Sequence, residues 1–206
     1  MTRRFNVAMA ALLLGACQII SYGCGSSPSG PKPAELTPIQ PKATLRVLWQ
    51  GNVGSAEKNV YFPSKSGNVV YAVGAEGAVT GFDTSRGTTV VRIEAGQRVT
   101  GGVGGGDGLV LLGTPRGEVL AFDRNGKSLW KAQLTGEVLS PPQAQQGIVA
   151  ARTGDGRVFG LDAASGKQKW MYQRTTPTLS LRTHSGLVIE RGAVFVGFPG
   201  GRLVGI

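Results

Sequence analysis

The stretch that decides the fold is Arg116-Gly-Glu-Val-Leu-Ala-Phe-Asp123, followed by a turn at Asn125-Gly126 and by Lys127-Ser-Leu-Trp130. Short apolar runs bounded by Gly and by Asp-x-Asn-Gly indicate brief strands joined by tight turns. Similar stretches lie on both sides. The glycines that mark the repeat are Gly77, Gly117 and Gly156, and the matching aspartates are Asp83, Asp123 and Asp162, at spacings of 40 and 39 residues. Self-similarity at this period is typical of propellers and solenoids.

Each copy of the repeat contains short strands, turns at close intervals and no helical periodicity, so we predict an all-β fold class. A sheet of three or four short strands cannot bury both of its faces, but copies stacked radially can. We therefore predict a partial β-propeller with one four-stranded blade per copy, about three and a half blades in all. The predicted repeats cover residues 69–108, 109–147 and 148–192, with an incomplete one at 193–206. One strand of each copy carries a Trp position, occupied by Trp49, Trp130 and Trp170 and by Val90 in the remaining copy.

Several conspicuous residues are best explained structurally. The recurring aspartates follow the repeat, so we interpret them as turn stabilisers and not as acid-base catalysts. The run Gly101–Gly106 lacks the Lys-Ser/Thr pair and the helix of a phosphate loop, and we expect a flexible connection between blades. His184 is the only His and is expected to be solvated, so neither a His-based metal site nor a Ser-His-Asp triad is predicted.

Composition narrows the function classes further. The 206 residues include 33 Gly, are 41% hydrophobic and carry a formal charge of +10. The basic residues are scattered singly, with no run longer than Arg3-Arg4, so we predict a solvated surface and no nucleic-acid partner. The alternative is that the positive charge binds an acidic protein or a lipid surface. Two Cys exclude a disulfide-rich scaffold and a four-Cys zinc site.

The first residues have the character of a secretory signal. Arg3-Arg4 precedes an apolar run over 5–14, and no acidic residue occurs before Glu35. We predict a lipoprotein signal over 1–23 with lipid on Cys24, or alternatively on Cys17, whose preceding Leu-Gly-Ala also fits the cleavage box. An ordinary cleaved signal with incidental thiols is the third possibility. Neither Cys is followed by Asp, the residue associated with inner-membrane retention, so an outer-membrane address is expected. The Pro-rich segment 24–45 is predicted to be an extended tether, and 46–206 the propeller.

A strand followed by Gly-x-Val-x-Ala-Phe/Leu-Asp and by x-x-x-Gly-Lys-x-x-Trp resembles the blade of PQQ-like propellers. With the lipid box, the tether and Thr178-Leu-Ser-Leu-Arg182, the chain resembles the BamB family of outer-membrane β-barrel assembly lipoproteins over residues 45–206. This resemblance implies an eight-bladed ring, which needs on the order of 320 residues. We therefore expect an amino-terminal piece of a longer propeller, whose open edges promote association.

The resemblance also implies a function. It predicts a non-catalytic scaffold lipoprotein on the periplasmic side of the outer membrane, which binds the periplasmic domains of the barrel-assembly component BamA and needs no cofactor, metal or small-molecule substrate. The family's equivalents of Leu179, Leu181 and Arg182 contact that component. From the residues alone, these three lie where the repeat is expanded. They fit either an interface with apolar anchors beside a guanidinium, or two Leu packed between blades beside an Arg that caps a turn.

Two other classes share the blade pattern. One is a generic cell-envelope binding propeller. The other is a fragment of a PQQ-dependent dehydrogenase, a class that resembles this chain in its blades but uses a vicinal Cys-Cys pair. Cys17 and Cys24 are not adjacent and both lie in the leader, which disfavours the enzyme.

Overall fold

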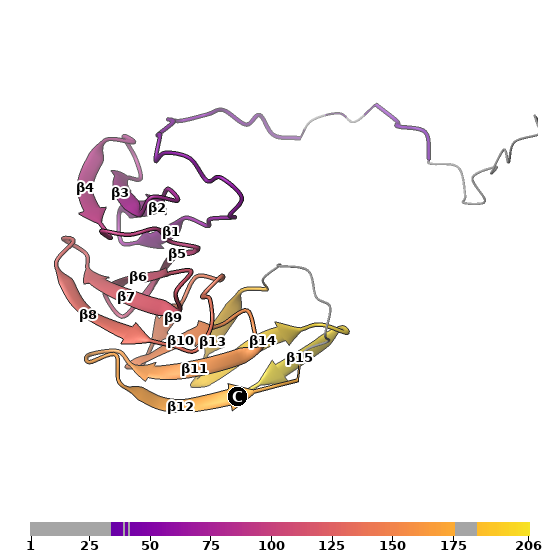
Figure 1. The fold of residues 1–206 in the computed structure, drawn as a ribbon. Coiled ribbons are helices and arrows are strands. Elements are labelled where there is room, and N and C mark those ends of the chain that lie inside the picture. Colours follow the sequence, from indigo (N-terminus) through magenta and orange to yellow (C-terminus); the bar gives the residue numbers. More distant parts are fainter. Residues whose placement is uncertain (1–33, 39, 41, 176–184) are drawn as a thin grey trace, which may run out of the picture. The chain divides into compact units, whose positions relative to one another are not determined.

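A computed structural model describes residues 34–38, 40, 42–175 and 185–206 (Figure 1). Residues 46–206 form one compact unit, and every regular element described in it is a β-strand. The strands form four antiparallel sets, here called blades 1–4. Blade 1 holds β1 (Ser64–Ser66), β2 (Val69–Val73), β3 (Ala78–Asp83) and β4 (Thr89–Glu94); blade 2 holds β5 (Gly101–Gly106), β6 (Leu109–Gly113), β7 (Glu118–Asp123) and β8 (Ser128–Gln133). Blade 3 holds β9 (Gln143–Gln145), β10 (Ile148–Arg152), β11 (Arg157–Asp162) and β12 (Gln168–Gln173); blade 4 holds β13 (Leu187–Glu190), β14 (Ala193–Phe198) and β15 (Arg202–Gly205).

Each blade is a meander in which neighbouring strands pair in chain order. The innermost strands of successive blades lie side by side, β1 against β5 and β9 against β13, and β5 meets β9 in one parallel bridge, Gly105 to Gln143. The register of the last two strands shifts at the same place in blades 1, 2 and 3, immediately after Gly81, Ala121 and Gly160. The predicted all-β partial propeller is therefore confirmed.

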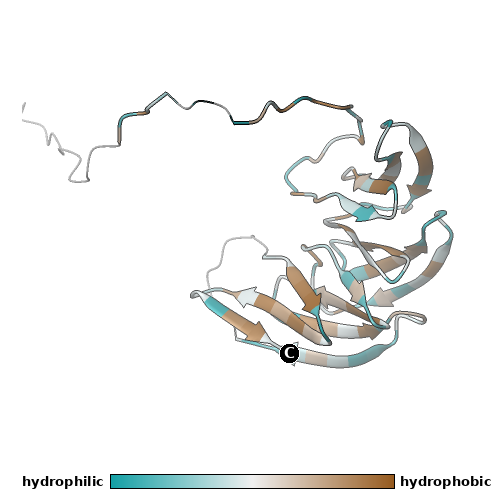
Figure 2. Cartoon of the chain, turned by 180° about the vertical axis from the view of Figure 1, so that it is seen from behind, coloured by the Kyte–Doolittle hydropathy of each residue, from teal (hydrophilic) through white to brown (hydrophobic). Residues whose placement is uncertain are grey.

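The apolar core lies between the blades, as expected for small sheets that can bury their faces only against neighbouring sheets. One cluster joins blades 1 and 2, a second joins blades 2 and 3, and a third joins blades 3 and 4. Strand β6 shows why, since Leu109 and Leu111 belong to the cluster with blade 3 while Val110 and Leu112 belong to the cluster with blade 1. Successive side chains of a strand point to opposite faces, so a continuous apolar run buries both faces. Figure 2 shows the apolar residues concentrated along the strands and the hydrophilic ones at the turns.

The Trp position fastens one blade to the next. The indole Nε1 of Trp130 in blade 2 donates to the backbone oxygen of Ala163 in blade 3 at 2.9 Å, and its ring covers Gly166 so closely that a Cβ there would lie 2.5 Å away. Trp49 repeats this contact on blade 1, with a 2.9 Å hydrogen bond to the backbone oxygen of Thr84 and its ring over Gly87.

The assignment of Val90 to the Trp position is wrong by one residue. In the sheet, Gly81 pairs with Val91, just as Ala121 pairs with Trp130 and Gly160 with Trp170. The turn from Asp83 to Gly87 has one residue more than the turn from Asp123 to Gly126, so a fixed spacing of 40 residues misplaces the position.

The expectation that Gly101–Gly106 is a flexible connection is also wrong, because this run is strand β5, mostly buried, at the inner edge of blade 2. Its glycines allow the main chain of blade 3 to approach. A Cβ on Gly104 would lie 1.8 Å from the backbone oxygen of Pro142, and one on Gly106 would lie 1.8 Å from that of Ala144. Glycine in a strand often marks such a close backbone approach.

Candidate functional site at the junction of blades 3 and 4

The connection between blades 3 and 4 is the longest of the three. It runs over 174–186, whereas residues 95–100 and 134–142 link the earlier blades. The expansion of the repeat read from the sequence therefore falls between β12 and β13. Some predicted site residues lie outside the described residues, namely Cys17, Cys24, Leu179, Leu181, Arg182 and His184.

Arg152, at the end of β10, holds the carboxyl end of this connection. Its Nη1 donates to the backbone oxygens of Ser185 at 3.2 Å and Gly197 at 2.8 Å, and also to the Ser185 hydroxyl. That hydroxyl in turn donates to the Gly197 oxygen at 2.7 Å. The guanidinium carbon lies 5.0 Å from the ring centroid of Phe198, within range of a cation–π contact. Burial lowers the pKa of Arg152 from its ordinary value. One partly buried cation thus ties blade 3, the connection and β14 together.

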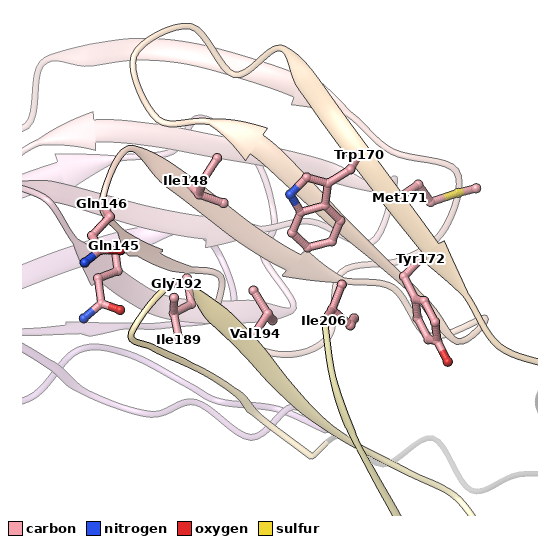
Figure 3. Close-up of a pocket in the computed structure, with 10 residues that line it drawn as sticks. All are labelled: Gln145, Gln146, Ile148, Trp170, Met171, Tyr172, Ile189, Gly192, Val194 and Ile206. Carbon is pink, nitrogen blue, oxygen red and sulfur yellow. The ribbon is translucent and has the colours of Figure 1, made fainter.

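A cavity of about 420 Å³ lies between blades 3 and 4 (Figure 3). Trp170 and Tyr172 reach from β12 toward blade 4, where Val194 and Ile206 face them. Its other lining residues are Gln145, Gln146, Ile148, Met171, Ile189 and Gly192. Gln145 Oε1 is buried without a hydrogen-bond partner. None of the ten lining residues is Asp, Glu, His, Lys or Arg, so the cavity suits an apolar group with a hydrogen-bond donor better than it suits proton transfer.

Neither Arg152 nor the cavity is among the features predicted from the sequence. A signal for Arg152 existed, because it pairs with Val158 at the place where Val73 and Gly113 stand in blades 1 and 2. A charge at a position otherwise held by small or apolar residues marks a departure from the repeat. The cavity had no such signal, because it depends on how β12 faces the strands of blade 4.

The interpretation of the repeated aspartates as turn stabilisers is confirmed. Asp83 Oδ1 accepts from the backbone of Ser85 at 3.0 Å and of Arg86 at 2.9 Å, and Asp123 Oδ1 accepts from the backbone of Asn125 at 2.8 Å. Hydrogen bonds from the Ser85 hydroxyl and then from these backbone groups lower the pKa of Asp83. Each aspartate thus closes the turn between the third and fourth strands of its blade.

Asp162 is expected to make stability depend on pH in the acid range. The hydrogen bond from Lys169, followed by that from Ser165, lowers the pKa of Asp162 to about 2, below the value near 3.9 of an unfolded chain. A carboxyl with a depressed folded pKa stabilises the fold above its unfolded pKa and loses that contribution as pH falls through the folded value. Asp162→Asn should therefore destabilise the protein at pH 7, with the difference shrinking between about pH 5 and pH 2. Urea unfolding of both proteins across this range measures it, and a difference that stays constant would contradict the assignment.

Among the residues that the structure describes, no group of three or more His, Cys, Asp or Glu side chains is placed to hold a metal ion. In the same residues, no helix has the length and apolar character needed to cross a bilayer.

The comparisons with known proteins bear on the whole blade region. A protein-family profile described as "Outer membrane protein assembly factor BamB" matches residues 75–206. The chain belongs to the BamB family. BamB of Nitrosomonas eutropha is 43% identical over 173 residues, which cover 84% of this chain and 42% of the relative. BamB of Bordetella pertussis is 35% identical over 200 residues, covering 97% and 51%. The crystal structure of BamB from Moraxella catarrhalis matches with a TM-score of 0.66 and 27% identity, covering 71% of this chain and 45% of that one.

The chain spans about half the length of the curated BamB relatives that it matches. Both the resemblance read from the blade motif and the propeller fold are confirmed by these matches.

Proposed function

We propose that the chain acts as a non-catalytic scaffold lipoprotein in outer-membrane protein assembly. The observation that carries the proposal is the match of residues 75–206 to the BamB assembly-factor family, supported by the propeller structure of the same region. It would lie on the periplasmic side of the outer membrane, held by lipid on Cys24, or alternatively on Cys17. Its blades would present loops to a BamA-like barrel-assembly protein while β-barrel proteins are inserted.

The proposed partner site comprises Leu179, Leu181 and Arg182. They belong to the connection between blades 3 and 4, whose length departs from the repeat, and departures from local regularity are expected at functional sites. Arg152 fixes Ser185, the first described residue after this segment. Two Leu anchors beside an Arg have the composition of an interface hot spot.

Replacing Leu179, Leu181 and Arg182 together by Ala tests this proposal. Hot-spot residues contribute about 2 kcal/mol or more each, so capture of the barrel-assembly protein from outer-membrane extract should fall at least about tenfold. Circular dichroism should stay unchanged. The matched control replaces Val90, Leu129 and Arg116, exposed side chains of blades 1 and 2, and should bind as the parent does.

Undiminished binding by the triple variant would remove these residues from the site. Failure of the parent chain to capture the barrel-assembly protein, with retention of other envelope components, would favour the generic cell-envelope binding propeller instead.

A further inference from the structure

Arg152 carries more hydrogen-bond donors than the fold around it uses. A guanidinium has five N–H groups. The hydrogen bonds of Arg152 all come from Nη1, which donates to Ser185 and to the backbone oxygen of Gly197. In the part of the chain that the structure describes, Nη2 and Nε have no acceptor. Three N–H groups of this partly buried side chain are therefore available to another molecule.

The positive charge of Arg152 also has no counter-ion among the described residues. Cations elsewhere in the blades do have one, since Lys131 pairs with Glu118 at 2.9 Å and Arg157 pairs with Asp155 at 2.6 Å. For Arg152, burial lowers the pKa and no described carboxylate raises it again. Partly buried charges are normally paired, because leaving water without a partner costs free energy. Arg152 departs from this rule.

The nearby sequence supplies no acid for this pairing. Between Asp162 and Glu190 there is no Asp or Glu, and the connection from blade 3 to blade 4 contains Arg174 and Arg182 instead. The whole stretch is therefore basic. Glu190 itself pairs with its neighbour Arg191. A counter-ion for Arg152 has to come from outside this stretch of chain.

We infer that Arg152 binds the carboxylate of an Asp or Glu side chain on the protein that docks at the junction of blades 3 and 4. The existence of that protein rests on the proposed function, and the acidic character of its contact residue is the addition made here. The two oxygens of a carboxylate accept paired hydrogen bonds from adjacent N–H groups of a guanidinium, which suits the available Nε and Nη2. Stacking of the blades does not itself require a cation at this place, because Val73 and Gly113 occupy it in blades 1 and 2.

Capture of the barrel-assembly protein from outer-membrane extract by the full-length chain tests the inference. Arg152→Gln should lower capture at least about tenfold, because the carboxylate of the partner is then left unpaired in the interface. Arg152→Lys keeps the charge and should lose several-fold less. Capture by the parent should also weaken more steeply with added salt than capture by Arg152→Gln. The matched control is Arg116→Gln, which removes an exposed charge from the turn before β7 and should bind as the parent does.

Two results of this experiment would contradict the inference. One is undiminished capture by Arg152→Gln. The other is an equal loss in Arg152→Gln and Arg152→Lys with an unchanged salt dependence, which would assign the effect to the hydrogen bonds of Nη1 within the fold. Circular dichroism identifies a variant that fails to fold, and in that case the following measurement on the parent chain decides.

A measurement without the partner separates this inference from the proposed function. Acetate is the probe, since it presents the same carboxylate. In the full-length chain with 15N-labelled arginine, the Nε–H signal of Arg152 is identified by its loss in Arg152→Lys. It should shift saturably with sodium acetate but not with sodium chloride at equal ionic strength, and the signal of Arg116 should shift with neither. An Arg152 signal that does not respond to acetate would overturn the inference. A normal acetate response in a chain that fails to capture the barrel-assembly protein would contradict the proposed function and leave Arg152 as a carboxylate site.

Discussion

Trp130→Ala is expected to lower the free energy of unfolding by about 3–5 kcal/mol, the range for deleting a buried Trp side chain. The loss combines two effects. The ring is 9% exposed and belongs to the cluster between blades 2 and 3, so its removal leaves a cavity there. Its hydrogen bond to the Ala163 oxygen, which ties the turn of blade 3 to blade 2, disappears as well. In a thermal melt followed by circular dichroism the midpoint should fall by about 10 °C or more.

Trp170→Ala provides the matched control for this prediction. Trp170 stands at the same position of blade 3 but lines the cavity toward blade 4 and remains partly exposed. Its truncation should cost clearly less, because it enlarges a space that is already present. If the two variants lose equal stability, the contact with the next blade's turn is not what makes Trp130 important.

Gly104→Ala is expected to cost about 3 kcal/mol or more, at the upper end for overpacking of a filled interior. The new methyl group would lie 1.8 Å from the backbone oxygen of Pro142 and 2.8 Å from its carbonyl carbon. Main chain cannot rotate away as a side chain can, so β5 and the segment leading into β9 must separate. Urea unfolding should show a lower midpoint, and the soluble yield should fall.

Gly186→Ala is the control for Gly104→Ala. An added Cβ on Gly186 has nothing within 4 Å, and its backbone does not require a positive φ. The expected change is within about 0.5 kcal/mol. A Gly104→Ala protein as stable as Gly186→Ala would show that the inner strands of blades 2 and 3 do not approach as closely as described.

The fold could be predicted from the sequence because the residues that set its turns are close to one another in each repeat. A glycine before each third strand and an aspartate after it set the turns, and the resulting strands are too short to bury their faces without neighbours. The same rule misled at two places. Counting 40 residues from Trp130 reached Val90, because the turn at Asp83 is longer by one residue, whereas the sheet places Val91 there. The low apolar content of Gly101–Gly106 concealed a strand whose function is to let two backbones approach.

Less of the candidate site could be predicted. The expanded connection was visible as a departure from the repeat, and it was located correctly between the third and fourth blades. The sequence marks Arg152 as a departure from the repeat but does not reveal its role, because its partners Ser185 and Gly197 are far along the chain and contact it only when blade 4 packs on blade 3. The same holds for the cavity beside Trp170. Contacts between blades belong to the stack, and no single copy of the repeat encodes them.

The division of the apolar core into clusters that each join two consecutive blades has a consequence for cooperativity. The stability of such a row of blades is approximately a sum of the contributions of single blades and of the contacts between neighbouring blades. A change in one contact therefore affects distant blades only through the blades between them. Among the described residues, blades 2 and 3 each share apolar clusters with two neighbouring blades. Local opening of one blade should therefore weaken first the blades that share a cluster with it, and the duplication of a unit inside the row would insert one more coupling without redesigning the rest.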